Sequence, residues 1–413
     1  MARLEGPSSI RYRPLHRAGN EVRLLELQRA ATNDVNERVV CRLVHERLID
    51  SSSAASTTSA ASTSSVGAAA SPPSDFIALS TLLGDMTVTE TVQINGSRVA
   101  LPGNVVEALR FMRTVFLAPS PPTPSSSIAD FHQTQSESSS TNPAPAPPPA
   151  SATPKKTPGW LRSLFKNVRS ILAEPPESGG SGSRGGNPPL RIWIDLLCIN
   201  RRDAREEAEK RSHMAKAYRS ARMVVGWLGP KDDTSDLAID IIRQWNACMP
   251  ATFGEPGDRE AHPDDYAPVM QWMGPVAHLS DIPPGITDPR DVPSYKAISG
   301  FLDRPYFRNA WILEDMAMAR FPAFLLGDDI ISWMEVLRLN RVNEDIKDNG
   351  AAMFPDELRH LLEYMPLGSV HAFLQEFEMR QRQHGITPAM LLAGTGSMKS
   401  SIKSSAASTA GDT

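Results

Sequence analysis

The sequence predicts an α/β protein with a small, mainly parallel sheet flanked by helices. Two apolar runs of strand length, residues 190–200 and 221–229, are each followed by an amphipathic helical pattern, residues 201–221 and 235–249. Strands that alternate with helices at this spacing are typical of βαβ units, whose strands lie parallel in one sheet. Long Ser/Pro-rich insertions interrupt the pattern, and we expect them to be disordered because they offer little to bury.

The first 117 residues add further strands and one helix. VRLLEL (22–27) and RVVCRLV (38–44) favour strands, and DFIALSTLLGD (75–85) is another short apolar run. TVQINGSRVAL (91–101) predicts a hairpin, because an Asn-Gly pair between alternating residues favours a two-residue turn. VVEALRFMRTVF (105–116) predicts a helix with its apolar residues on one face.

The second half continues with helices and one more strand. We expect loops in the Pro-rich residues 250–293 and one or two helices over 294–320, broken at Asp303–Pro305. FPAFLLGDD (321–329) predicts a strand, and ISWMEVLRLN (331–340) predicts a helix. Residues 355–385 carry further apolar helical positions.

Composition divides the chain into ordered and low-complexity parts. The expected divisions are an N-terminal strand region (1–50), a Ser/Ala linker (51–74), the first part of the main domain (75–117), a Pro/Ser/Gly-rich insertion (118–189) with an amphipathic helix at 157–172, the core motif part (190–340), a helical C-terminal region (341–393) and a disordered tail (394–413).

The helix within the insertion has a basic amphipathic pattern. Trp160, Leu164, Val168 and Leu172 recur every four residues, and the surrounding stretch KKTPGWLRSLFKNVRSIL carries five Lys or Arg and no acidic residue. Such a helix can contact a membrane surface or a partner's groove, or pack on its own domain.

Charge and cysteine content exclude several classes. Formal net charge is −4, from 43 basic and 47 acidic residues, which argues against nucleic acid as a partner. Three widely spaced cysteines (Cys41, Cys198 and Cys248) predict neither a disulfide framework nor a metal site. No apolar run is long enough to span a membrane, and no Walker or GxGxxG motif occurs. We therefore expect a cytoplasmic protein.

Several short blocks occur in an order that resembles a known family. The blocks comprise Ala78, Leu79, Ser80, Gly84 and Asp85; Asn104, Ala108, Leu109, Arg110 and Arg113; Trp193, Ile194, Asp195, Cys198, Ile199, Asn200, Asp203 and Glu206; Trp227, Leu228 and Gly229; and Arg304, Trp311, Glu314 and Asp315. They resemble the heterokaryon incompatibility (HET) domain of filamentous fungi. The chain departs from the family pattern at Thr81, Leu83, Arg201 and Glu314.

The resemblance implies a doubly wound core similar to Toll/interleukin-receptor (TIR) domains. It further implies an effector of fungal non-self recognition and programmed cell death, a form of innate immunity. Such an effector acts as a signalling module through protein partners or self-association. A diverged, inactive copy is an alternative, prompted by the departures from the family pattern.

The resemblance also raises a catalytic alternative. Some TIR domains cleave NAD with a glutamate, so Glu206, with Asp195, would serve as the catalytic pair and NAD as substrate, with no assigned cofactor. The structural alternatives are a helix-start partner for Glu206 and a carboxylate that accepts backbone N–H groups for Asp195. Cys198 is expected to be a buried structural cysteine, and Trp227, Tyr306, Phe307 and Trp311 to be core residues.

Overall fold

The computed structural model describes residues 10–16, 20–32, 34–48, 74–117, 189–255, 257–280, 283–309, 316, 318–319, 321–350, 352, 374–375 and 379. The predicted linker before Ser74, the insertion before Pro189 with its helix at 157–172, nearly all of 355–385 and the tail lie outside the described residues.

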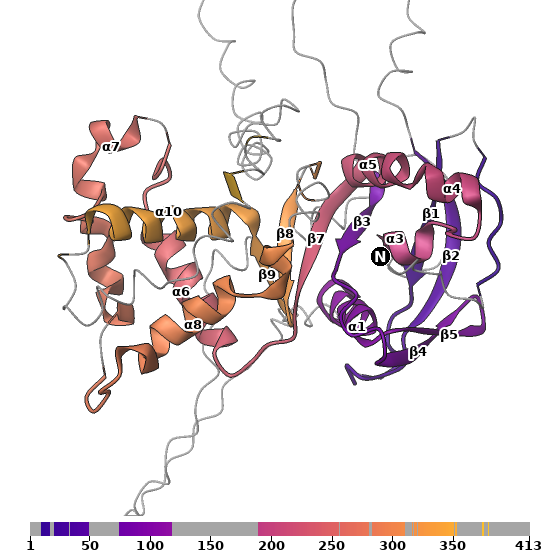
Figure 1. The fold of residues 1–413 in the computed structure, drawn as a ribbon, viewed down its shortest axis with the longest axis horizontal. Coiled ribbons are helices and arrows are strands. Elements are labelled where there is room, and N and C mark those ends of the chain that lie inside the picture. The colour runs from indigo at the N-terminus through magenta and orange to yellow at the C-terminus, as the bar shows by residue number, and fades with distance from the viewer. Residues whose placement is uncertain are drawn as a thin grey trace, which may run out of the picture. The chain divides into compact units, whose positions relative to one another are not determined.

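The described strands form one sheet with the order β5-β4-β2-β1-β6-β3-β7-β8-β9 (Figure 1). Their bounds are β1 Glu21–Leu27, β2 Val40–Arg47, β3 Ser74–Ser80, β4 Thr89–Ile94, β5 Ser97–Pro102, β6 Leu190–Trp193, β7 Ala221–Gly229, β8 Pro322–Leu326 and β9 Asp329–Ser332.

The sheet is mixed, and the expectation of a mainly parallel sheet is wrong. β6, β3, β7 and β8 run parallel as neighbours. β1 pairs antiparallel with both β2 and β6, and the pairs β4–β5 and β8–β9 are also antiparallel. The two latter pairs have connections of only two residues, and such short connections force adjacent strands to run antiparallel.

The helices connect and flank these strands. Their bounds are α1 Gly103–Leu117, α3 Asp195–Cys198, α4 Ala204–Ala208, α5 Lys210–Ser220, α6 Ser235–Cys248, α7 Asp258–Ala261, α8 Pro293–Leu302 and α10 Trp333–Asn349, with 3₁₀ segments η3 Pro263–Asp265, η4 Gln271–Ser280, η5 Pro289–Asp291 and η6 Pro305–Arg308. α1 contacts β4, β5, β6 and β7, and α5 contacts β3 and β7. α6 packs on α8 and α10, forming a group of helices next to β8 and β9 (Figure 1). No described helix has the length and apolar character that crossing a membrane requires.

Local sequence signals are confirmed at the hairpin. β4 and β5 meet at Asn95 and Gly96, which have φ of 51° and 81°. Both values lie in the left-handed region that the two-residue turn requires, where Asn and Gly are the tolerated residues.

The prediction of one strand over residues 190–200 is wrong. β6 ends at Trp193, and the short helix α3 begins at Asp195. Leu196, Leu197 and Cys198 are buried from this helix, and a short apolar run does not distinguish a buried strand from a buried helical turn. The helix predicted over 201–221 is likewise divided, into α4 and α5, at Glu209.

Close packing at β7 gives a stability prediction. Gly226 lies in the middle of this strand, and a Cβ there would stand 2.5 Å from the hydroxyl of the buried Tyr306. Gly226→Ala should lower the free energy of unfolding by about 1–3 kcal/mol, because the added methyl group displaces a packed ring. Urea unfolding followed by circular dichroism measures the change. Gly274→Ala is the control, since a Cβ at that position would meet no other atom within 4 Å. Equal urea midpoints of unfolding for the two variants would contradict the packing argument.

Candidate functional site

The loop that follows β6 is organised by the polar residues of its motif. Asn200 accepts a hydrogen bond from the Arg202 N–H at 3.2 Å. Asp203 then caps α4 by accepting from the N–H groups of Arg205 and Glu206, at 3.0 and 3.4 Å. Asp and Asn in these places satisfy N–H groups that a turn or a helix start leaves open. The capped start of α4 directs the Glu206 side chain inward, where its exposed fraction is 8%.

Glu206 forms a buried, two-pronged ion pair with Arg23 of β1. The Arg23 side chain is fully buried, and its two terminal nitrogens donate to the two carboxylate oxygens of Glu206, the second at 3.2 Å. The Asn200 N–H donates to the same carboxylate at 2.9 Å. Both oxygens of Glu206 are therefore engaged by groups of the domain itself.

Arg23 has an acceptor for each of its N–H groups. Besides Glu206, it donates to the carbonyl of Cys198 at 3.1 Å and twice to the carbonyl of Arg13, at 3.2 and 2.8 Å. A guanidinium has five N–H donors, and these five bonds use all of them. The Tyr12 ring also lies 5.0 Å from the guanidinium carbon. Arg23 thus ties β1, the β6–α4 loop and the N-terminal segment together.

Burial suppresses ionisation of the neighbouring side chains. Burial, with the nearby Cys198, raises the pKa of Tyr12 to about 12. Burial also raises the pKa of the Cys198 thiol to about 12, and the Cys198 sulfur accepts the Ile194 N–H at 3.5 Å. Cys198 is 2% exposed, as expected for a structural cysteine.

Asp195 lies in the first turn of α3 and faces a different partner. Arg201 donates to its carboxylate at 2.6 Å, and the exposed fractions of the two side chains are 32% for Asp195 and 10% for Arg201. Arg201 is one of the positions at which the chain departs from the family pattern. Its charge neutralises Asp195, which is the more exposed of the two carboxylates that the sequence suggests for catalysis. The two carboxylates have different partners, and neither is left without one.

A second group of motif residues meets at Asn104, near the start of α1. The Trp227 indole N–H donates to the Asn104 side-chain oxygen at 3.0 Å. The Asn104 amide donates to the carbonyl of Leu82 and to the hydroxyl of Thr81, the latter at 3.2 Å. Gly84 has a φ of +71°, and a Cβ there would stand 3.0 Å from that of Asn104. These contacts hold the segment after β3 against α1 and β7.

Arg304 fixes the segment between β7 and α6. It donates to the carbonyl of Pro230 at 2.8 Å, to the carboxylate of Asp232 at 2.7 Å and to the hydroxyl of Ser235 at 2.9 Å. Gly229 begins this turn with a φ of +107°. Arg304 and Gly229 therefore shape the connection between β7 and α6.

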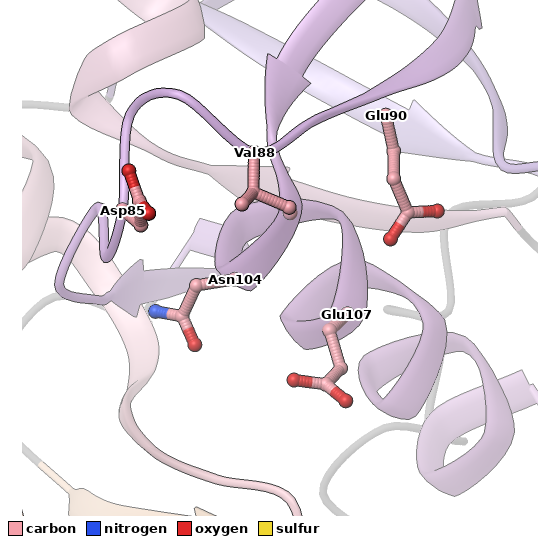
Figure 2. Close-up of a pocket in the computed structure, with 6 residues that line it drawn as sticks. Asp85, Val88, Glu90, Asn104 and Glu107 are labelled. Atoms are coloured by element: carbon pink, nitrogen blue, oxygen red, sulfur yellow. The ribbon is translucent and has the colours of Figure 1, made fainter.

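An open acidic pocket of about 330 Å³ lies beside Asn104 (Figure 2). Its lining residues are Asp85, Val88, Glu90, Gly103, Asn104 and Glu107. Asn104 and Glu107 are three positions apart on α1, and Figure 2 shows both side chains bordering the pocket. Burial raises the pKa of Glu107, and the neighbouring Glu90 adds to this rise, against the effect of Arg110. Three of the six residues that line the pocket, Asp85, Glu90 and Glu107, are acidic.

Most of the motif residues are interior. The buried members are Ala78, Leu79, Ser80, Ala108, Leu109, Arg113, Trp193, Ile194, Cys198, Ile199, Glu206, Trp227 and Leu228. Trp227 stacks on Phe111, and Trp193 meets Tyr218 edge to face. Tyr306 and Phe307 are buried as expected, whereas Trp311, Glu314 and Asp315 lie outside the described residues.

Sequence reasoning missed Arg23, the partner of Glu206. The available signal was a basic residue inside the apolar run VRLLEL. If that strand is buried, the basic side chain needs an acidic partner. The acidic pocket was also missed, because it joins residues from the β3–β4 connection, β4 and α1. Among the described residues, no group of three or more His, Cys, Asp or Glu side chains is arranged to hold a metal ion.

Comparison with known proteins finds two similarities, one to a family model and one to a curated relative. Residues 183–315 match the family model described as heterokaryon incompatibility protein (HET). The chain is also similar to heterokaryon incompatibility protein 6, OR allele, of Neurospora crassa, with 24% identity over 156 residues. That match covers 35% of this chain, and the chain spans about a fifth (21%) of the length of the relative. No solved structure matches the chain.

The buried ion pair gives a prediction about stability. Glu206→Gln should lower the free energy of unfolding by about 3–5 kcal/mol, because Arg23 then keeps a buried charge without its counter-ion. Chemical unfolding monitored by tryptophan fluorescence measures the loss. Glu209→Gln serves as the matched control, since Glu209 is 58% exposed and its weak pair with His213 contributes about 0–1 kcal/mol. Similar stabilities for both variants would show that the pair is dispensable.

The cysteines give a prediction about reactivity. Cys41 and Cys198 are buried, and burial raises the pKa of each thiol to about 12, so both stay protonated at pH 8, whereas Cys248 is partly exposed. Only the thiolate reacts readily with iodoacetamide. Mass spectrometry of the native protein should therefore find Cys248 labelled and the other two labelled only after unfolding. Rapid native labelling of Cys198 would contradict its structural assignment.

Proposed function

We propose that this chain, which carries a heterokaryon incompatibility domain, takes part in fungal non-self recognition as a signalling module that acts through protein contacts. The family match over residues 183–315 and the similarity to the Neurospora crassa protein support the general role. The module is proposed to trigger programmed cell death when it meets its protein partner or associates with itself.

The observation that carries the non-catalytic mechanism is the state of Glu206. A carboxylate that stabilises a ribosyl centre has to reach the substrate. Glu206 is 8% exposed, both of its oxygens accept hydrogen bonds from Arg23, and one also accepts the Asn200 N–H. Substrate contact would require breaking a buried ion pair, which is strongly unfavourable. Asp195, which is more exposed, is paired with Arg201.

A double substitution separates the structural from the catalytic role of Glu206. In Arg23→Met/Glu206→Met both charges disappear together, and apolar replacement of a buried ion pair is often neutral or stabilising. We expect this variant to be more stable than Glu206→Gln and to keep the incompatibility response. The response is measured as the fraction of dye-permeable cells after hyphal fusion, at matched protein levels.

Purified protein provides the second readout. Wild-type protein, concentrated or clustered through a fused oligomerisation tag, should leave NAD intact when followed by liquid chromatography. A folded double variant that loses the cellular response, together with NAD loss by the wild type, would overturn the proposal in favour of a TIR-like glycohydrolase. Absence of a response from the wild type itself would point to a diverged, inactive copy.

A further inference from the structure

The outer side of β5 has no partner strand among the described residues. β5 is the terminal strand in the sheet order and pairs with β4 alone. A two-residue turn makes its flanking residues, here Ile94 and Ser97, a hydrogen-bonded pair. Hydrogen-bonded and non-hydrogen-bonded pairs then alternate along the hairpin. The backbone N–H and C=O groups of Arg98 and Ala100 therefore point away from β4.

These outward backbone groups belong to the exposed residues of the strand. Arg98 and Ala100 are exposed, whereas the alternate residues Val99 and Leu101 are fully buried on the other face. Within the described part of the chain, no hydrogen bond engages the outward groups of Arg98 and Ala100. A row of unpaired N–H and C=O groups is a template for pairing with another strand.

The opposite edge of the sheet, β9, is protected in ways that β5 is not. β9 has four residues, and Ile330, whose backbone faces away from β8, is 4% exposed. The Ser332 N–H also faces outward, and it donates to Glu335 at 2.7 Å in the cap of α10. A short strand whose outward groups are buried or capped resists pairing with another edge. Of the two edges of the described sheet, β5 is therefore the one that can accept another strand.

A second copy of the same strand fits this edge best in one antiparallel register. With a twofold axis at Val99, Arg98 of each copy lies opposite Ala100 of the other, and both pairs are hydrogen-bonded pairs. A shift by two residues in one direction places the two Arg98 side chains opposite each other, and like charges in that position are destabilising. The opposite shift places Arg98 against Pro102, which has no N–H to donate.

We propose that β5 pairs antiparallel with β5 of a second copy of this chain, with Val99 of both copies at the twofold axis. The contact joins two sheets into one continuous sheet and involves neither Glu206 nor Asp195. This inference rests on the proposed function, because it names the surface through which the module associates with itself. A contact made by one pair of short strands is small and belongs with the weak, transient interfaces. It therefore forms mainly where copies are held close together.

Disulfide trapping tests both the contact and its register. Arg98→Cys and Ala100→Cys are made separately in full-length protein that carries Cys248→Ser, since Cys41 and Cys198 are buried. Opposite Cα atoms of a hydrogen-bonded pair are about 5.5 Å apart, which suits a disulfide. We expect copper phenanthroline in air to cross-link a mixture of the two variants.

Either variant alone is the control for the register. Two copies of one variant hold their cysteine Cα atoms about 9 Å apart, which is too far for a disulfide. The single-variant samples should therefore give little product. Equal yields in the mixture and in the single-variant samples, or no cross-link in any of them, would overturn the proposal.

Charge variants measure the same contact at equilibrium. Ala100→Glu places a carboxylate opposite Arg98 of the second copy, at both ends of the twofold contact, and should lower the dimer dissociation constant about fivefold in sedimentation equilibrium. Ala100→Lys places like charges there and should raise the constant by about the same factor. Val269→Glu and Val269→Lys are the matched controls, since they change the net charge equally at a side chain that is 50% exposed outside β5. Equal responses at the two positions would contradict the strand contact.

Failure of this contact is distinguishable from failure of the proposed function. We expect a dissociation constant on the order of 100 μM for so small an interface. Wild-type protein that sediments as a monomer up to about 1 mM, about tenfold above that value, would overturn the β5 contact and leave a role through another partner intact. A dimer that Ala100→Lys weakens, in a chain without any incompatibility response, would support the contact and overturn the proposed function.

Discussion

The rest of the domain depends on how it accommodates one arginine that is buried in its sheet. Taking a guanidinium out of water costs several kcal/mol unless a counter-ion and further acceptors surround it. Arg23 lies in β1, next to β6, and its side chain is fully buried. It requires a carboxylate from α4, the carbonyl at the end of α3 and a carbonyl from the N-terminal segment. The positions of these segments follow from that requirement.

The same requirement explains the most specific motif of the family resemblance. Asn200 shapes the turn, Asp203 caps α4, Cys198 contributes its carbonyl and Glu206 completes the ion pair. Asn200, Asp203 and Glu206 act through their side chains, whereas Cys198 contributes a backbone carbonyl that any residue type would supply. The spacing of the motif can therefore be explained without a substrate. The Asn104 and Arg304 groups act similarly on the connections after β3 and β7.

The sequence predicts the local elements better than their assembly. The Asn95–Gly96 hairpin, α1, β7 and α6 follow from turn chemistry and periodicity, which are properties of short segments. The pairing of Arg23 with Glu206 joins residues 183 positions apart, and no local pattern encodes such a contact. The orientation of β1 likewise depends on its pairing with the distant strand β6. The end of β6 at Trp193 was missed because an apolar run suits a buried strand and a buried helical turn equally. The acidic pocket depends on tertiary contacts between the β3–β4 connection and α1.

The burial of most motif residues also limits which residues can take part in recognition. A surface that distinguishes one partner from another must present side chains that differ without unfolding the domain, and buried motif residues do not meet this condition. Substitution of Trp227 or Glu206 changes the core, whereas Met86, Val88 and Asp85 can change with little effect on packing because they are exposed. The interior motif residues therefore account for the architecture of the domain, and the proposed role in recognition would depend on exposed side chains instead.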